Sequence, residues 1–141
     1  MKESERIALV AGFILGEGSF GIHKSYTHKS RLVITPKLEI GNTERALLEY
    51  CKDTIGGYIT KSYQRTPNRK PVWLLLILKR ELLFKVCRIL RPYLMGKKAQ
   101  IVELMIEFLE SRLNSNLHHG YSEREIEICN LVKVLNRRGC K

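Results

Sequence analysis

The stretch "AGFILGEGSF", residues 11–20, joins an uncharged apolar run to a single carboxylate enclosed by two glycines. The run from Ile7 to Gly16 predicts a helix over 4–16, capped by Ser4 and buried on more than one side because it is apolar all round. Glu17 follows at the helix C-terminus, where the partial negative charge makes a carboxylate unfavourable. A hard cation there would remove the conflict, since a carboxylate and unpaired carbonyl oxygens are ligands that suit Mg²⁺.

Small residues recur on one face of this predicted helix. Gly12 and Gly16 are four residues apart, and Ala8 lies one turn earlier. This spacing permits close backbone contact with a second helix. The partner is either another helix of the same chain, packed in the core, or the same helix of a second copy. A twofold dimer would place two copies of Glu17 side by side.

The remaining sequence predicts a single α+β domain over 1–141 with the element order αββαββα and extra C-terminal helices. We expect one four-stranded, mostly antiparallel sheet with the helices on one face. Pro36 lies within a predicted strand and indicates an edge or a bulge there. Ser122 and Glu125 form a capping-box pattern that opens the last helix. The predicted hairpins are 19–40 and 57–79, and the further helices are 43–55, 81–91, 97–114 and 122–137.

Positive charge is concentrated on the two predicted hairpins. The chain carries a net charge of +11, from 25 Lys and Arg against 14 Asp and Glu, and we expect all the acids to lie outside the hairpins. A cationic sheet face suits DNA, and alternation along a strand would direct polar side chains to one face, where they could contact phosphates and base edges. The alternative is an ordinary solvated face. The candidate DNA-binding residues are His23, Ser25, Lys29, Arg31, Thr35, Lys37, Thr60, Ser62, Gln64 and Arg69.

Other features exclude several kinds of site. Cys51, Cys87 and Cys129 lie within apolar patterns and form no CxxC pair, so we expect small buried hydrophobic residues rather than a zinc site or disulfides. No apolar run approaches the ~20 residues that span a membrane, and the mixed-charge start is unlike a signal peptide. These features predict a soluble intracellular protein, in prokaryotic cytoplasm or an organelle, with neither a membrane partner nor a small-molecule cofactor.

The segment Val10–Gly18, "VAGFILGEG", resembles the nine-residue motif of the LAGLIDADG homing endonucleases. The predicted element order, the basic hairpins and the segment "RPYLMGKKAQ" at 91–100 fit the same family. Members with one motif act as homodimers, and this chain has one. The resemblance implies Mg²⁺-dependent, site-specific cleavage of both strands of a long pseudo-palindromic DNA target, as in intron or intein homing. It also implies two or three divalent ions per dimer, partly shared.

The resemblance assigns roles to individual residues. Glu17 stands at the acidic eighth place of the motif, the metal-ligating carboxylate, and Gly16 would offer its backbone carbonyl. Asn42 matches a position that orders active-site water, and it also fits a helix N-cap. Lys97 matches a basic residue near the scissile phosphate, with Lys98 the alternative if the register differs by one.

One letter of the motif departs from the family pattern, and two other classes of function stay open. Leu15 occupies the sixth place, where the family has an acid that is not the metal ligand. One alternative is a non-cleaving nucleic-acid binder on the same scaffold, an intron-splicing maturase or a transcriptional regulator. The other is a basic α+β protein-interaction module without a nucleic-acid role. The presence of Glu17 and Lys97 favours the nuclease.

Overall fold

A computed structural model of the chain describes residues 1–62, 71–115 and 120–137. The observed order of elements is the predicted αββαββα with additional C-terminal helices. The elements are α1 (Glu3–Glu17), β1 (Gly18–Tyr26), β2 (Leu32–Asn42), α2 (Arg45–Ile55), β3 (Tyr58–Lys61), β4 (Trp73–Ile77), α3 (Arg80–Leu90), the 3-10 turn η1 (Arg91–Tyr93), α4 (Gly96–Asn114) and α5 (Glu123–Leu135).

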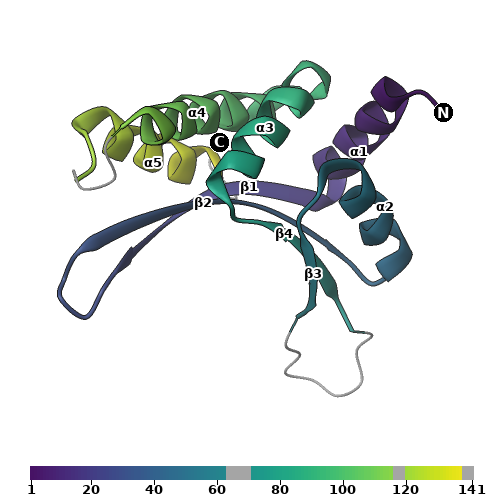
Figure 1. The fold of residues 1–141 in the computed structure, drawn as a ribbon, viewed down its shortest axis with the longest axis horizontal. Coiled ribbons are helices and arrows are strands. Elements are labelled where there is room, and N and C mark those ends of the chain that lie inside the picture. Colours follow the sequence, from purple (N-terminus) through teal and green to yellow (C-terminus); the bar gives the residue numbers. More distant parts are fainter. Residues whose placement is uncertain (63–70, 116–119, 138–141) are drawn as a thin grey trace.

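The four strands form one antiparallel sheet in the order β1-β2-β4-β3, which confirms the predicted fold class. Figure 1 shows the sheet bent into an arch, with the helices on its convex side and nothing described over its concave side. The two hairpins form the limbs of the arch. We call the concave side the open face.

Alternation along the strands builds the core on the convex side. In β2 the even-numbered residues from Ile34 to Ile40 are buried, and the odd-numbered residues between them are partly exposed. Leu75 and Ile77 of β4 continue the buried layer; α1, α2 and α3 pack against β2, α2 packs against β4, and α4 and α5 pack against β1. The three cysteines predicted to be core residues are buried, and burial raises the pKa of the Cys87 thiol to about 12.

Two of the three predicted helix caps are wrong. Helix α1 begins at Glu3, so Ser4 lies inside it, and α2 begins at Arg45 after Glu44. Asn42 is instead the last residue of β2, where its Oδ1 accepts a hydrogen bond from the Glu44 N–H at 2.8 Å. The capping box at Ser122 is present, as predicted.

Pro36 lies where β2 is locally an edge of the sheet, as predicted, and there is no bulge. The pairing of β1 with β2 is continuous, with Pro36 opposite Ile22. Strand β4 pairs with β2 only from Leu38 to Asn42, so residues 32–37 pair with β1 alone. Next to the proline, the N–H of Ile34 donates to the Tyr121 hydroxyl at 2.9 Å.

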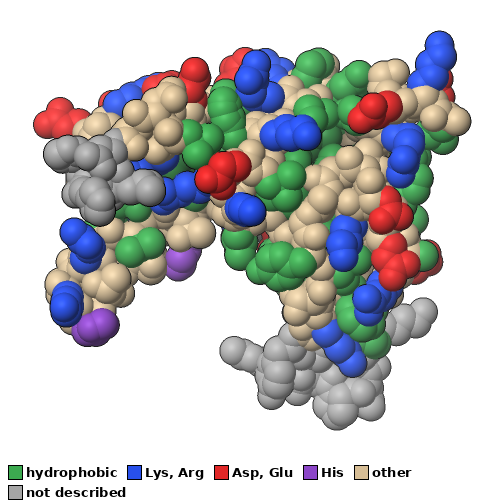
Figure 2. Space-filling view, in the orientation of Figure 1, with side chains coloured by type: hydrophobic (Ala, Val, Ile, Leu, Met, Phe, Trp, Pro, Cys, Tyr) green, Lys and Arg blue, Asp and Glu red, His purple; other side chains and the backbone are tan. Residues whose placement is uncertain are grey.

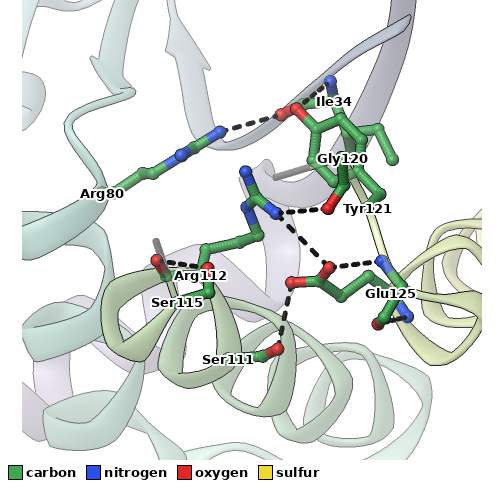
Figure 3. Close-up of polar contacts among 9 residues, drawn as sticks. Ile34, Arg80, Ser111, Arg112, Ser115, Gly120, Tyr121 and Glu125 are labelled. Atoms are coloured by element: carbon green, nitrogen blue, oxygen red, sulfur yellow. Dashed lines mark hydrogen bonds and ion pairs between the residues drawn. The ribbon is translucent and has the colours of Figure 1, made fainter. Parts of the chain in front are cut away.

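A buried ion pair links α4 to α5 beneath this edge (Figure 3). Arg112 Nη1 lies 3.4 Å from Glu125 Oε1, and the two side chains are 6% and 4% exposed. The guanidinium also stacks 4.3 Å from the Tyr121 ring centroid. Because Tyr121 in turn contacts β2, the pair belongs to the contact that positions the first hairpin.

The expectation that every acid lies outside the hairpins is wrong at one position. Glu39 belongs to β2 and lies 4.0 Å from Lys37. It is the single acid within the four strands as the structure describes them. In the described ranges, no helix combines the length and apolar character needed to cross a membrane.

Candidate nucleic-acid interface and catalytic end

The first hairpin presents its predicted polar residues together on the open face. His23 lies opposite Thr35 in the register, and Lys37 lies opposite Gly21, so these side chains share one side of the pleat. Lys29 and Arg31 are exposed in the turn at the end of the hairpin. Figure 2 shows basic side chains on both limbs of the arch.

The second hairpin contributes fewer described polar residues. Thr60 of β3 is exposed and lies opposite Leu74, and Ser62 continues the same pleat, with its N–H donating to the Val72 carbonyl at 2.8 Å. The predicted residues Gln64 and Arg69 lie outside the described residues.

The open-face residues of β4 were not predicted from the sequence. Leu74 and Leu76 alternate with the buried Leu75 and Ile77, and they lie opposite Thr60 and Tyr58. The run "VWLLLILK" is apolar at nearly every position, which hides the alternation. The alternation becomes visible only when the pairing of β4 with β2 is known, because that pairing shows which β4 residues lie on the same side as the buried residues of β2.

The motif acid lies where α1 passes directly into β1. Glu17 is the last residue of the helix and is exposed, and Gly18 opens the strand. A Cβ at Gly18 would lie 2.9 Å from the Ile14 side chain and 3.1 Å from its carbonyl oxygen. Glycine is therefore required at this position for the chain to turn so sharply, and the turn leaves the Glu17 carboxylate at the end of the sheet.

A lysine occupies the helix end beside Glu17. Lys98 Nζ donates to the carbonyls of Ile14 at 2.9 Å and Leu15 at 2.8 Å. Burial lowers the pKa of this ammonium, and the charge of Glu17 opposes that shift. The cation that the helix end needs is thus supplied within the chain, so the unfavourable position of Glu17 is no longer an argument for a metal by itself.

The two adjacent lysines therefore differ in their surroundings. Lys98 is half-buried against α1, whereas Lys97 is exposed on the first turn of α4. Asn42 lies near the same end of the sheet, because Gly18 pairs with Ile40 two residues before it. The structure thus brings Glu17, Lys98 and Asn42 to one end of the sheet.

Within one protomer, α1 is not buried on more than one side. Val10, Ala11 and Ile14 of this helix are buried against the rest of the protein, but Leu9 is 54% exposed. Ala8 is half-buried on the flank of this open side.

The glycines of α1 lie on the same open side. A Cβ built at Gly12 or Gly16 would meet no atom within 4 Å. Packing against the described residues of the chain therefore requires a glycine at neither position.

One chain offers few side chains that could bind a metal ion at this site. The described residues contain no group of three or more His, Cys, Asp and Glu side chains placed to hold a metal ion. One exposed carboxylate beside backbone carbonyls fits Mg²⁺, which takes few protein ligands and completes its shell with water and phosphate oxygens. It does not fit a structural zinc site, which takes four protein ligands.

No protein-family model matches the sequence, and no curated protein matches it. Among solved structures, the chain is similar to an archaeal intron-encoded homing endonuclease, I-Vdi141I, complexed with DNA, with a TM-score of 0.81 and 21% identity over 98% of this chain and 88% of that one. It is similar to the homing endonuclease I-CvuI in complex with its target in the presence of Ca, with a TM-score of 0.75 and 17% identity over 99% and 86%. For the homing endonuclease I-TnaI the TM-score is 0.73, with 22% identity over 94% and 88%. The chain therefore has the fold of the LAGLIDADG homing endonucleases, in a single copy.

Proposed function

We propose that the protein is a homodimeric, Mg²⁺-dependent endonuclease that cleaves both strands of a specific, long, pseudo-palindromic DNA target, as homing endonucleases do. The observation that carries the proposal is the position of Glu17. This exposed carboxylate lies at the end of a cationic, concave sheet. It also lies at the end of a helix whose two glycines, Gly12 and Gly16, have no neighbouring atoms above them. Several proteins with the same fold are homing endonucleases in complex with DNA, which supports the same substrate class.

The open face is the proposed DNA-binding surface. Its described residues on the first hairpin are mostly polar or basic, with Val33 and Glu39 as the exceptions, and an antiparallel sheet of this kind fits the major groove of B-DNA. Contacts from Lys29, Arg31 and Lys37 to phosphates would release counterions, so the affinity should fall steeply with salt. The single acid on this face, Glu39, can accept a hydrogen bond from a cytosine amino group.

The exposed side of α1 that carries Gly12 and Gly16 is the proposed dimer contact. Ala8, Gly12 and Gly16 lie at helical spacing, and without side chains the two glycines allow two helices to approach closely. A twofold axis through this contact would bring two Glu17 carboxylates together and place one sheet on each half-site. The pseudo-palindromic target follows from that symmetry.

The proposed site uses residues of α1, β2 and α4. Glu17 and the Gly16 carbonyl would hold Mg²⁺ with the partner's Glu17, which permits shared ions between the two sites. When bound, Mg²⁺ supplies an acidified water and charge stabilisation at the phosphate. Lys97, which is exposed, would contact the phosphate, and Lys98 would fix the helix end that carries Glu17. Asn42 would orient water.

The test of the chemistry is the variant Glu17→Gln. It removes the charge and keeps the shape, so DNA binding should persist while Mg²⁺-dependent cleavage of a selected target is abolished. Glu3→Gln, at the exposed opposite end of the same helix, is the matched control and should cleave normally. Full cleavage by the Glu17 variant would overturn the mechanism. Binding without cleavage by the natural sequence would favour a maturase or a regulator.

The test of the dimer is the variant Gly12→Leu, measured by sedimentation equilibrium. The natural chain should sediment at twice the 16.4 kDa of one chain, and the variant at the mass of one chain. The position is open in the protomer, so the added side chain should not prevent folding. Lys133→Leu adds the same side chain to an exposed position on α5 and should leave the mass unchanged. A dimeric Gly12→Leu protein would refute the proposed contact.

A further inference from the structure

Three aliphatic side chains form a continuous group on the open face of β4 and the residues just before it. We call Val72, Leu74 and Leu76 the apolar strip. They alternate with Trp73, Leu75 and Ile77, which face the helices, and all three are partly exposed. None of the three packs against the hydrophobic core, although their neighbours Trp73 and Leu75 do. The apolar strip therefore lies outside the hydrophobic core of the protomer.

The surrounding backbone is shaped to leave the apolar strip accessible. Gly41 of β2 lies opposite Leu74, and a Cβ there would meet Leu74 Cδ2 at 3.3 Å and Val72 Cγ1 at 3.8 Å. Because residue 41 is glycine, the Leu74 side chain lies against the backbone of β2 and not against another side chain. Figure 2 shows hydrophobic side chains at the roof of the arch, between the basic side chains of its two limbs.

We infer that the apolar strip recognises thymine methyl groups in the major groove of the DNA target. The inference rests on the proposed function, because it requires DNA on the open face. The C5-methyl of thymine is the one apolar group that a base pair presents in the major groove, and the other positions present donors or acceptors. Leu74 and Leu76 can neither donate nor accept a hydrogen bond. A polar base edge placed against them would lose its hydrogen bonds to water and gain none from the protein, which costs binding free energy.

The occupant is DNA rather than protein because of what surrounds the apolar strip. Leu74 lies between Gly41 and Thr60, and polar and basic residues of the first hairpin continue the face. A face with a basic periphery and a small aliphatic centre is complementary to a phosphate-lined groove that carries methyl groups.

The sheet register places these contacts in the inner part of each half-site. Leu76 lies opposite Glu39, and Glu39 lies opposite Ser19, two residues after Glu17. The row that contains Leu76 therefore begins beside the proposed catalytic end, whereas Lys29 and Arg31 lie at the far end of the first hairpin. Leu74 and Leu76 are about 7 Å apart along the strand, which corresponds to about two base-pair steps.

The experiment begins with DNA selected by the natural protein from a randomised, palindrome-biased library. Selected sites are resynthesised with deoxyuridine at single thymine positions, which removes the methyl group and keeps the base pairing. At two positions in the inner half-site, about two steps apart, each replacement should weaken binding about fourfold, the effect of losing one buried methyl. In Leu74→Ala/Leu76→Ala the same replacements should have no effect. Leu113→Ala, an exposed leucine on α4, is the matched control and should retain the full effect.

The outcomes separate this inference from the proposed function. Selection of a defined site whose inner thymines tolerate deoxyuridine overturns the apolar strip as a methyl reader and leaves the endonuclease intact. Persistence of the deoxyuridine effect in the double alanine variant does the same. If no defined sequence is selected, both the inference and the proposed function are overturned. Because the first measurement uses the natural protein, misfolding of a variant cannot hide the result.

Discussion

The buried pair of Arg112 and Glu125 predicts that its two members are far from equivalent. Glu125 has partners besides Arg112: it accepts from the Ser122 N–H at 2.8 Å and from the Ser111 hydroxyl at 3.0 Å. Arg112 has weaker support, with the Gly120 carbonyl at 3.5 Å, and its Nε has no hydrogen-bond partner among the residues that the structure describes. Removing the carboxylate therefore leaves a buried cation almost without partners, whereas removing the guanidinium leaves a carboxylate that is still hydrogen-bonded.

The expected magnitudes follow from this asymmetry. Breaking a buried ion pair at one end costs about 3–5 kcal/mol, and losing a capping interaction adds about 1 kcal/mol. Glu125→Met should therefore lower the free energy of unfolding by about 4–6 kcal/mol. Arg112→Met, which leaves two hydrogen bonds on Glu125, should lower it by about 1–3 kcal/mol. The double variant should be more stable than Glu125→Met alone, because no unpaired charge stays buried.

The assay is urea denaturation of the four proteins, followed by far-UV circular dichroism at one protein concentration. A fixed concentration is necessary because dimerisation would contribute to the measured stability. The reasoning is refuted if Arg112→Met is destabilised as much as Glu125→Met, or if the losses in the double variant simply add.

Three further predictions concern other contacts. Lys98→Met should lower the free energy of unfolding by about 1–3 kcal/mol, because two helix-end carbonyls lose their partner, whereas the exposed Lys97→Met should change it by less than about 0.5 kcal/mol in the same urea assay. Burial raises the pKa of Glu125, but hydrogen bonds from Ser122 and Ser111 and the charge of Arg112 outweigh it, so the folded pKa lies below the ordinary value. Its stabilisation should be complete above the unfolded pKa of about 4.3 and lost as pH falls through the folded pKa, and a stability profile that stays flat from pH 5 to 2 would contradict this. Burial raises the pKa of Cys87 to about 12, so iodoacetamide at pH 8 should label this thiol only in urea, as peptide mass spectrometry would show.

Periodicity was enough to predict most of the architecture. Helix and strand patterns gave the order of elements and the antiparallel sheet, and the Ser122 capping box was correct because it depends only on residues three apart. The burial of the cysteines also followed from local pattern. These features are set by neighbours in the sequence.

The errors arise where a residue's surroundings come from distant parts of the chain. An apolar helix such as α1 can be covered on any side, and its sequence does not say that the side with Gly12 is left open. The role of Lys98 at the end of α1 depends on contact between residues 84 positions apart. Asn42 was expected to cap a helix, but β2 continues to that residue because β4 pairs with it there.

The polar groups at the edge of β2 bear on how copies of the protein can meet. Backbone groups of Ile34 and Pro36 point the same way, two residues apart, away from β1. The Ile34 N–H is bonded to the Tyr121 hydroxyl, its carbonyl accepts from Arg80 Nη2 at 3.5 Å, and Pro36 has no N–H to offer (Figure 3). An incoming strand would find few free backbone partners on this stretch, which otherwise would be a template for strand addition and aggregation. Strand addition at residues 32–37 is thereby disfavoured, where the inner strand β2 lacks β4 as a neighbour.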